Sequence, residues 1–235
     1  MRNLLITICA RGGSKGVKGK NIRDLAGFPL IYYTINQAKV WGKSKYIVVS
    51  TDSVEIVGVA KKYGAQVPFI RPKKFASDTT PKSEAIKHAL LESEKFFKKT
   101  FDYVMDLDAT APIRKIEDLE NAFKLFLEQK PKTLFSVVKA RRNPYFNMVE
   151  ENKEGRVHLS KKGNFARRQD APKVYDMNAS IYIYSRDYLL NERNNKPVTN
   201  DSIIYEMDEI SRTDIDSEID FKYIEFLVKE KIVTL

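Results

Sequence analysis

Four cationic side chains are mixed with glycines in the stretch CARGGSKGVKGKN at residues 9–21. The cations are Arg11, Lys15, Lys18 and Lys20, and the stretch follows directly on the apolar run NLLITIC. Glycine lets the main chain approach an anion closely, so such a loop after a first strand can present N–H groups and cations to phosphate. The alternative interpretation is a solvated basic turn.

The glycine spacing excludes the two common phosphate loops. A P-loop requires G-x-x-x-x-G-K-[ST] and the dinucleotide fingerprint requires G-x-G-x-x-G, and neither pattern occurs in this stretch. The remaining possibility is a phosphate site in which Arg11 supplies a planar guanidinium group and Lys15 and Lys20 supply point charges. We therefore predict that this loop binds phosphate.

Two aspartates near the C-terminus could hold a hard cation. Asp214 and Asp216 stand two residues apart in TDIDSEIDF, so both carboxylates point to one side of an extended segment. Capping of the following helix by Asp216 is the alternative. A second pair with the same spacing, Asp106 and Asp108, ends a predicted strand and could also bind a metal.

The elements that must position these residues alternate between strands and helices. Apolar, β-rich runs predict strands at 3–9, 45–51, 66–70, 102–107, 133–138, 178–184 and 203–207. Helical patterns occur at 29–41, 53–63, 82–98, 115–129 and 217–231. We therefore predict an α/β fold with a mostly parallel sheet and helices on both faces.

The alternation stops between residues 139 and 177, where the sequence becomes polar, turn-rich and aromatic. We interpret this segment as an arm inserted into a single domain that spans 1–235. Its aromatic residues Tyr145, Phe146 and Phe165 favour a role in dimerisation, or as a lid over substrate.

The charge balance favours anionic partners. The chain has 41 basic and 31 acidic residues, a net charge of +10, although scattered lysines can serve solubility alone. We find no helix-turn-helix, zinc-finger or RNP pattern, so we do not expect nucleic acid as a partner. We find no apolar stretch of about 18 residues, so we do not expect a membrane as a partner. The single cysteine, Cys9, permits no disulfide within the chain and fits a cytoplasmic protein.

Six segments, in order along the chain, resemble the CMP-sialic acid synthetases, also called the acylneuraminate cytidylyltransferase family. They are ARGGSKGVKGKN (10–21), IVVSTD (47–52), RPKKFASDTT (71–80), ATAPIR (109–114), RRQDAPKVYDMNASIYIY (167–184) and DIDSEIDF (214–221). The resemblance covers nearly the whole chain. It implies a Rossmann-like nucleotidyltransferase fold, a homodimer, CTP as co-substrate and Mg²⁺ as cofactor.

The resemblance also implies the reaction and the roles of the residues. CTP and a sialic-acid-like 2-keto-sugar acid with nine carbons would give the CMP-sugar and pyrophosphate, a transfer that needs positioning and charge neutralisation more than covalent catalysis. The expected catalytic residues are Arg11, Lys15, Lys20 and Asp216, with Asp214 and Asp216 as metal ligands. The expected nucleotide contacts are Arg11, Gly12, Gly13, Ser14, Lys15, Lys20, Asn21, Arg71, Ser77 and Asp78. The expected sugar contacts are Asp108, Thr110, Arg114, Phe146, Arg168, Gln169 and Tyr182.

Departures from the family pattern leave the sugar open. Asp108 replaces a glutamine that many members carry beside the sugar, and Phe146 stands where bacterial sialate enzymes often have a lysine. A carboxylate can only accept hydrogen bonds, so we expect an enzyme that is not tuned to N-acetylneuraminate alone. The alternatives are legionaminic, pseudaminic or 3-deoxy-manno-octulosonic acid as acceptor, or, outside enzymes, a basic nucleic-acid-binding protein.

Overall fold

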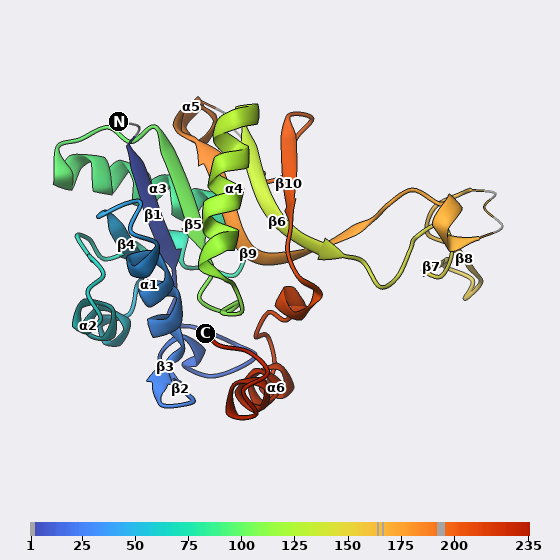
Figure 1. Cartoon of the computed structure of the whole chain (residues 1–235), viewed down its shortest axis with the longest axis horizontal. Helices are drawn as coiled ribbons and strands as arrows, with labels where there is room; N and C mark the ends of the chain where they lie inside the picture. Colours follow the sequence, from blue (N-terminus) through green and yellow to red (C-terminus); the bar gives the residue numbers. More distant parts are fainter. Residues whose placement is uncertain (1–2, 164, 166, 192–195) are drawn as a thin grey trace.

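A six-stranded sheet in the order β10-β6-β9-β5-β1-β4 forms the centre of the computed structural model, which describes residues 3–163, 165, 167–191 and 196–235 (Figure 1). β1 (Leu4–Cys9) is parallel to β4 (Ile47–Ser50) and to β5 (Tyr103–Leu107). β10 (Ser202–Glu206) is parallel to β6 (Thr133–Lys139). β9 (Tyr175–Ser185) is antiparallel to both β5 and β6, so the predicted mostly parallel sheet is confirmed.

Helices cover both faces of this sheet, as predicted. α1 (Leu30–Trp41), α2 (Val54–Lys62) and α4 (Ile116–Gln129) pack on one face, and α3 (Lys82–Phe97) and α5 (Arg186–Asn191) pack on the other. Successive side chains of β1 point to opposite faces of the sheet, and both faces are apolar. Leu4, Ile6 and Ile8 enter the first core cluster, whereas Leu5 between them enters the second.

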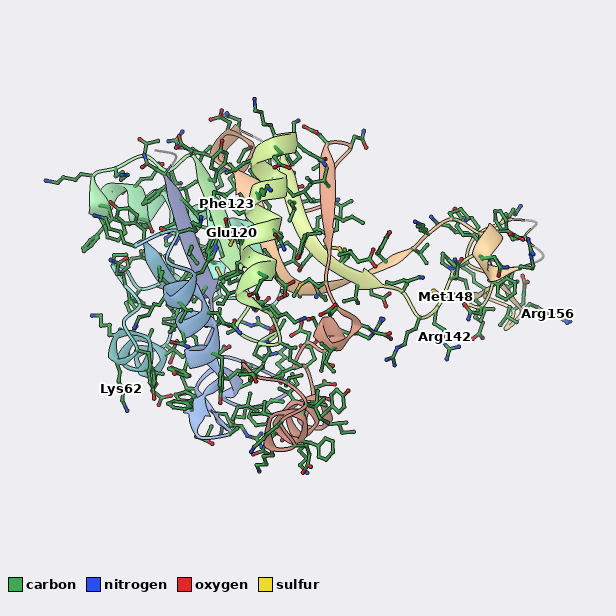
Figure 2. All side chains as sticks on the ribbon, viewed as in Figure 1. Lys62, Glu120, Phe123, Arg142, Met148 and Arg156 are labelled. Atoms are coloured by element: carbon green, nitrogen blue, oxygen red, sulfur yellow. The ribbon has the colours of Figure 1, made fainter. Side chains whose placement is uncertain are left out.

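α1 and α4 are joined by one aromatic side chain. The indole N–H of Trp41 donates to Glu120 Oε2 at 2.8 Å, and its ring meets Phe123 edge-on at 5.8 Å between centroids. Figure 2 shows Glu120 and Phe123 on α4. The helix-end position of Trp41 is therefore a packing position.

α6 (Glu218–Lys229) packs away from the sheet, against the loop that follows β1. Ser217 and Asp220 form a capping box at its N-terminus, which fixes where the helix begins. Its buried residues Phe221 and Ile224 share a core cluster with Val17 of the basic loop. This packing brings the C-terminal aspartates beside residues 11–20, close to the short strands β2 (Asp24–Leu25) and β3 (Phe28–Pro29) (Figure 1).

The segment between β6 and β9 projects from the body of the molecule as an arm (Figure 1). At its root the two strands still pair, as far as Lys139 with Tyr175. Its outer part carries a hairpin of β7 (Val149–Glu151) and β8 (Val157–Leu159). The excursion from the core therefore lies where the sequence predicts it, and its role in dimerisation stays a prediction.

One predicted strand, at 66–70, is wrong. Gln66 makes an isolated bridge to Val48, and no strand forms at these residues. Pro68 has no N–H to donate to a neighbouring strand, which ends the pairing after this bridge. None of the helices that the structure describes combines the length and the apolar composition that a membrane span requires.

Candidate active site

A cavity of about 420 Å³ opens at the carboxyl ends of β1, β4 and β5. β1 lies between the other two strands, and the helices α1 and α3 that precede β4 and β5 lie on opposite faces. Ligands of open α/β sheets bind at such a reversal of strand order. The lining residues are Cys9, Arg11, Ser14, Lys15, Gly16, Lys20, Asn21, Arg71, Phe75, Ser77, Asp78, Thr80, Lys82, Ala85, Asp108, Thr110 and Asp216.

Two cations of the basic loop meet one carboxylate at the mouth of the cavity. Arg11 Nη1 lies 2.7 Å from Asp78 Oδ1, and Lys15 Nζ lies 2.5 Å from Asp78 Oδ2. Hydrogen bonds from Lys15 and Arg11 hold the pKa of Asp78 below its usual range. The fold thus gathers the predicted phosphate-binding cations at one point and keeps them there with an internal anion.

Lys20 lies deeper and ties the basic loop to the C-terminal segment. Its Nζ donates to the Ile215 carbonyl at 2.5 Å and lies 3.2 Å from Asp216 Oδ1. Asn21 Nδ2 donates to the Arg11 carbonyl at 3.0 Å, so this amide shapes the loop from inside. Both side chains also line the cavity, as their predicted contact with a nucleotide requires.

The glycines divide into two groups. Gly16 lines the cavity, whereas Gly12 and Gly13 do not. The N–H of Gly12 donates to Asp52 Oδ1 at 2.9 Å, so that group is already used within the protein. The structure therefore gives Gly12 a part in holding the loop against the end of β4, and does not show it as a free phosphate donor. Ser14 lines the cavity, and its contact with a nucleotide stays a prediction.

Arg71 and Ser77 form the side of the cavity next to β4. Arg71 is buried and donates to the carbonyl oxygens of Ser50 and, at 3.4 Å, of Phe75. Ser77 Oγ lies 2.7 Å from Thr80 Oγ1. These contacts shape the segment after β4 into a wall of the cavity, and contact of this wall with the nucleotide stays a prediction.

The sequence reasoning missed Lys82, which meets the aspartates at the end of β5. Its Nζ lies 2.8 Å from Asp106 Oδ2 and 2.6 Å from Asp108 Oδ2. Burial alone would lower the pKa of Lys82, but Asp106 and Asp108 raise it above its ordinary value. For the carboxylate of Asp108 burial acts in the opposite direction and would raise the pKa, but Lys82 holds this pKa below its usual range. Both groups are therefore charged at neutral pH.

Three of the predicted sugar residues surround this ion pair. Thr110 Oγ1 donates to Asp108 Oδ1 at 3.3 Å. Arg114 is buried and donates to the carbonyl oxygens of Asp108 and, at 2.7 Å, of Ala111. Tyr182 lies with its ring centroid 4.9 Å from Lys82 Nζ. Arg114 thus braces the backbone at Asp108 and does not line the cavity, whereas Thr110 does.

The donors at Asp214 and Asp216 fit a hard divalent cation. Oδ1 of Asp214 is buried without a hydrogen-bond partner in the part of the chain that the structure describes. Burial, Asp108 and Asp216 together raise the pKa of Asp214, so a cation would relieve this carboxylate. No ready-made group of three or more His, Cys, Asp or Glu side chains occurs among the described residues. Mg²⁺ suits such a site, because it takes one or two carboxylates and completes its shell with phosphate oxygens and water.

Phe146 and Gln169 lie on the arm, outside the lining of the cavity. Phe146 is 41% exposed, and Gln169 lines a second cavity of about 690 Å³ at the root of the arm. Figure 2 places Arg142 and Met148, which flank Phe146 in sequence, on this projecting arm. The side chain of Arg168 lies outside the described part of the chain. A single chain therefore does not bring Phe146 or Gln169 to its own cavity.

A family model described as cytidylyltransferase matches residues 5–233. The chain belongs to the cytidylyltransferase family. The cytidylyltransferase resembles an N-acylneuraminate cytidylyltransferase of Oncorhynchus mykiss, at 34% identity over 190 residues, 79% of this chain and 42% of that protein. The expected kinship with acylneuraminate cytidylyltransferases is therefore confirmed, and the chain is a nucleotidyltransferase.

Two other relatives match this cytidylyltransferase over almost its whole length. It is 51% identical over 231 residues to CMP-N,N'-diacetyllegionaminic acid synthase of Campylobacter jejuni, with 98% of this chain and 97% of that protein covered. The same identity and coverage relate it to the post-translational flagellin modification protein B of Campylobacter coli. A solved CMP:2-keto-3-deoxy-manno-octonic acid synthetase complexed with CTP has the same fold, with a TM-score of 0.71 over 97% of this chain and 99% of that one at 16% identity.

Proposed function

We propose that this cytidylyltransferase transfers CMP from CTP to a nine-carbon 2-keto-sugar acid of the diacetamido, legionaminic type, with release of pyrophosphate. The observation that carries the proposal is 51% identity to a diacetyllegionaminic acid synthase over 97% of that protein. The departure at Asp108 supports it, because a carboxylate held beside the sugar favours an acceptor molecule rich in N–H and O–H donors. This choice favours legionaminic acid, an alternative of the sequence analysis, over the broader class of sialic-acid-like acceptors that was its main expectation.

The proposed reaction joins an oxygen of the sugar to the α-phosphorus of CTP. The anomeric hydroxyl attacks this phosphorus in line, the bond from the phosphorus to the bridging oxygen breaks, and pyrophosphate leaves with the electron pair. The hydroxyl proton passes to solvent. Arg11, Lys15 and Lys20 neutralise the charge that grows on the triphosphate and its leaving group. When an anionic nucleotide enters, it competes with Asp78 for the first two of these cations.

Asp214 and Asp216 would hold Mg²⁺ beside Lys20, at the end of the cavity where the basic loop meets the C-terminal segment. Bound there, the ion would supply Lewis-acid polarisation of the phosphate oxygens. The protein groups would orient the triphosphate around it. The CMP-sugar so made would serve a glycosyl transfer to a cell-surface acceptor, an idea that the flagellin-modification name of one relative supports.

Pyrophosphate release from CTP with a panel of sugar acids tests the proposal. The panel contains N,N'-diacetyllegionaminate, pseudaminate, N-acetylneuraminate and 3-deoxy-manno-octulosonate, each with ATP, GTP and UTP as nucleotide controls. We expect CTP to be required and the legionaminic acid to have the highest kcat/KM, by about tenfold or more, the scale of one mismatched buried hydrogen bond. Equal or faster use of N-acetylneuraminate would return the substrate to the sialate class.

A further inference from the structure

Lys82 occupies a position at which helix electrostatics disfavours a cation. It is the first residue of α3, and the N-terminus of a helix carries partial positive charge. Helix stability therefore gives no reason for a lysine at this position. Its side chain is one-third exposed, at 33%, and lines the cavity.

The ammonium group bridges one fixed carboxylate and one that faces the cavity. Asp106 is fully buried and accepts a hydrogen bond from Thr7 Oγ1 at 2.7 Å, so its position is set by the core. Asp108 lies two residues further on the same side of the chain, is 17% exposed and lines the cavity. Because Lys82 Nζ lies within 2.8 Å of Asp106 and 2.6 Å of Asp108, it ties the second carboxylate to the first.

The same contact changes the interpretation of the second aspartate pair. Asp106 and Asp108 have the spacing of a metal site, but the ammonium of Lys82 lies between them at hydrogen-bonding distance from both. A built-in cation thus neutralises part of the charge that a metal would otherwise be needed to neutralise. It also reduces the repulsion between these carboxylates and an entering sugar carboxylate or triphosphate.

We propose that Lys82 is a positioning residue for the sugar, acting through Asp108. By holding one oxygen of Asp108, with Thr110 on the other, it aims the remaining lone pairs of this carboxylate at an N–H or O–H donor of the acceptor. The inference rests on the proposed function, since it assigns Asp108 to the sugar and not to the nucleotide. Without Lys82, Asp108 would lose its orientation and its charge partner together.

The test is a double-mutant cycle with Lys82→Met and Asp108→Asn in the full-length enzyme, using CTP and the best acceptor of the panel. We expect Lys82→Met to raise KM for the sugar by about tenfold or more, on the scale of an unpaired buried charge, and to leave KM for CTP within about twofold. If Lys82 acts through Asp108, the double variant is no worse than Asp108→Asn alone, because the two changes remove one unit. Lys82→Gln, which keeps a donor, is expected to fall between wild type and Lys82→Met.

Lys87→Met is the matched control. Lys87 lies on the same helix, its Nζ donates to the Leu190 carbonyl at 3.2 Å, and neither residue lines the cavity. Its sugar KM should equal that of wild type, and thermal unfolding of each variant checks that the fold is retained. If Lys82→Met does not fold, Lys82→Gln replaces it, with a smaller rise in KM for the sugar and again no further loss when it is combined with Asp108→Asn.

The other outcomes contradict the inference in different ways. A rise in KM for CTP with an unchanged sugar KM would place Lys82 on the nucleotide, and fully additive effects of the two substitutions would separate it from Asp108. A wild-type enzyme that uses none of the sugars would overturn the proposed function, and the inference with it. An active wild type matched by Lys82→Met would overturn the inference alone.

Discussion

Gly16 of the basic loop packs directly on the backbone of Asp216. A Cβ placed on Gly16 would lie 1.8 Å from the Asp216 carbonyl oxygen, far inside van der Waals contact. Glycine is therefore required for close approach of two chain segments, and this approach sets the distance between the basic loop and the proposed metal site.

Gly16→Ala should accordingly damage both stability and activity. The added methyl group must push the loop away from Asp216, at a cost of about 1–3 kcal/mol in the free energy of unfolding, and kcat/KM should fall with it. Gly58→Ala in α2 is the control, because its Cβ would meet nothing within 4 Å. That variant should be neutral or more stable by about 0.5–1 kcal/mol in urea unfolding. Equal behaviour of the two variants would contradict the tight contact.

Lys15→Ala and Lys20→Ala should each reduce kcat/KM by roughly 10²–10³, the loss typical of one preorganised charge-stabilising donor. Their stabilities should differ. Lys15 is 79% exposed, so its removal leaves the unfolding temperature unchanged. Lys20 is 17% exposed and bonds to Ile215, so its removal should lower the free energy of unfolding by about 1.5–3 kcal/mol.

Lys18→Ala is the control for these loop lysines. Lys18 is exposed on the same loop and is not part of the cavity lining. Steady-state pyrophosphate assays should give wild-type kinetics for this variant. Near-normal activity of the Lys15 and Lys20 variants would return the loop to the interpretation of a solvated basic turn.

Asp214→Asn should separate metal binding from folding. Burial and the neighbouring Asp108 raise the pKa of Asp214, so the folded protein disfavours its charge and the amide should keep or raise the unfolding temperature without metal. Mn²⁺ added with CTP should raise that temperature in wild type and much less in the variant. An equal rise in both proteins would remove Asp214 from the metal site.

Cys9 should resist alkylation in the folded protein. Burial, followed by the charge of Asp106, raises the pKa of its thiol well above the ordinary value, and the thiolate is the reactive form. Because the chain has one cysteine, iodoacetamide labelling gives a single readout. At pH 8 the native protein should react far more slowly than the protein in guanidinium, and reaction at the rate of a free cysteine would contradict this.

The arm should mediate a homodimer. Val149 and Leu159 are paired across its hairpin and remain 61% and 38% exposed. Val149→Glu should place a charge in the interface and yield monomers in sedimentation velocity at micromolar concentration, where wild type is expected to be dimeric. Val40→Glu, at an exposed position on α1, should leave the assembly unchanged. A monomeric wild type would contradict the prediction.

Whether the sequence alone could identify a site residue depends on how few neighbouring residues its pattern spans. The basic loop and the pair Asp214 and Asp216 can be identified from the sequence, because charge, glycine content and two-residue spacing are properties of a few neighbouring residues. The sequence did not identify Lys82 as a site residue, because the residues next to it in the chain suggest no binding or catalytic role for it. The one available signal was a cation at the first position of a helix, where the helix dipole disfavours it.

The sequence by itself determined the alternation of strands and helices, the position of the arm and the types of side chain that can bind phosphate and metal, since periodicity and residue chemistry are local properties. Only the tertiary structure decided which of these side chains meet. Asp78 reaches Arg11, Lys82 reaches Asp108 and Lys20 reaches Ile215 because β1 lies between β4 and β5, and because α6 packs on the basic loop. These neighbours are set by strand order and core packing, which join segments that are distant along the chain and that no local pattern connects.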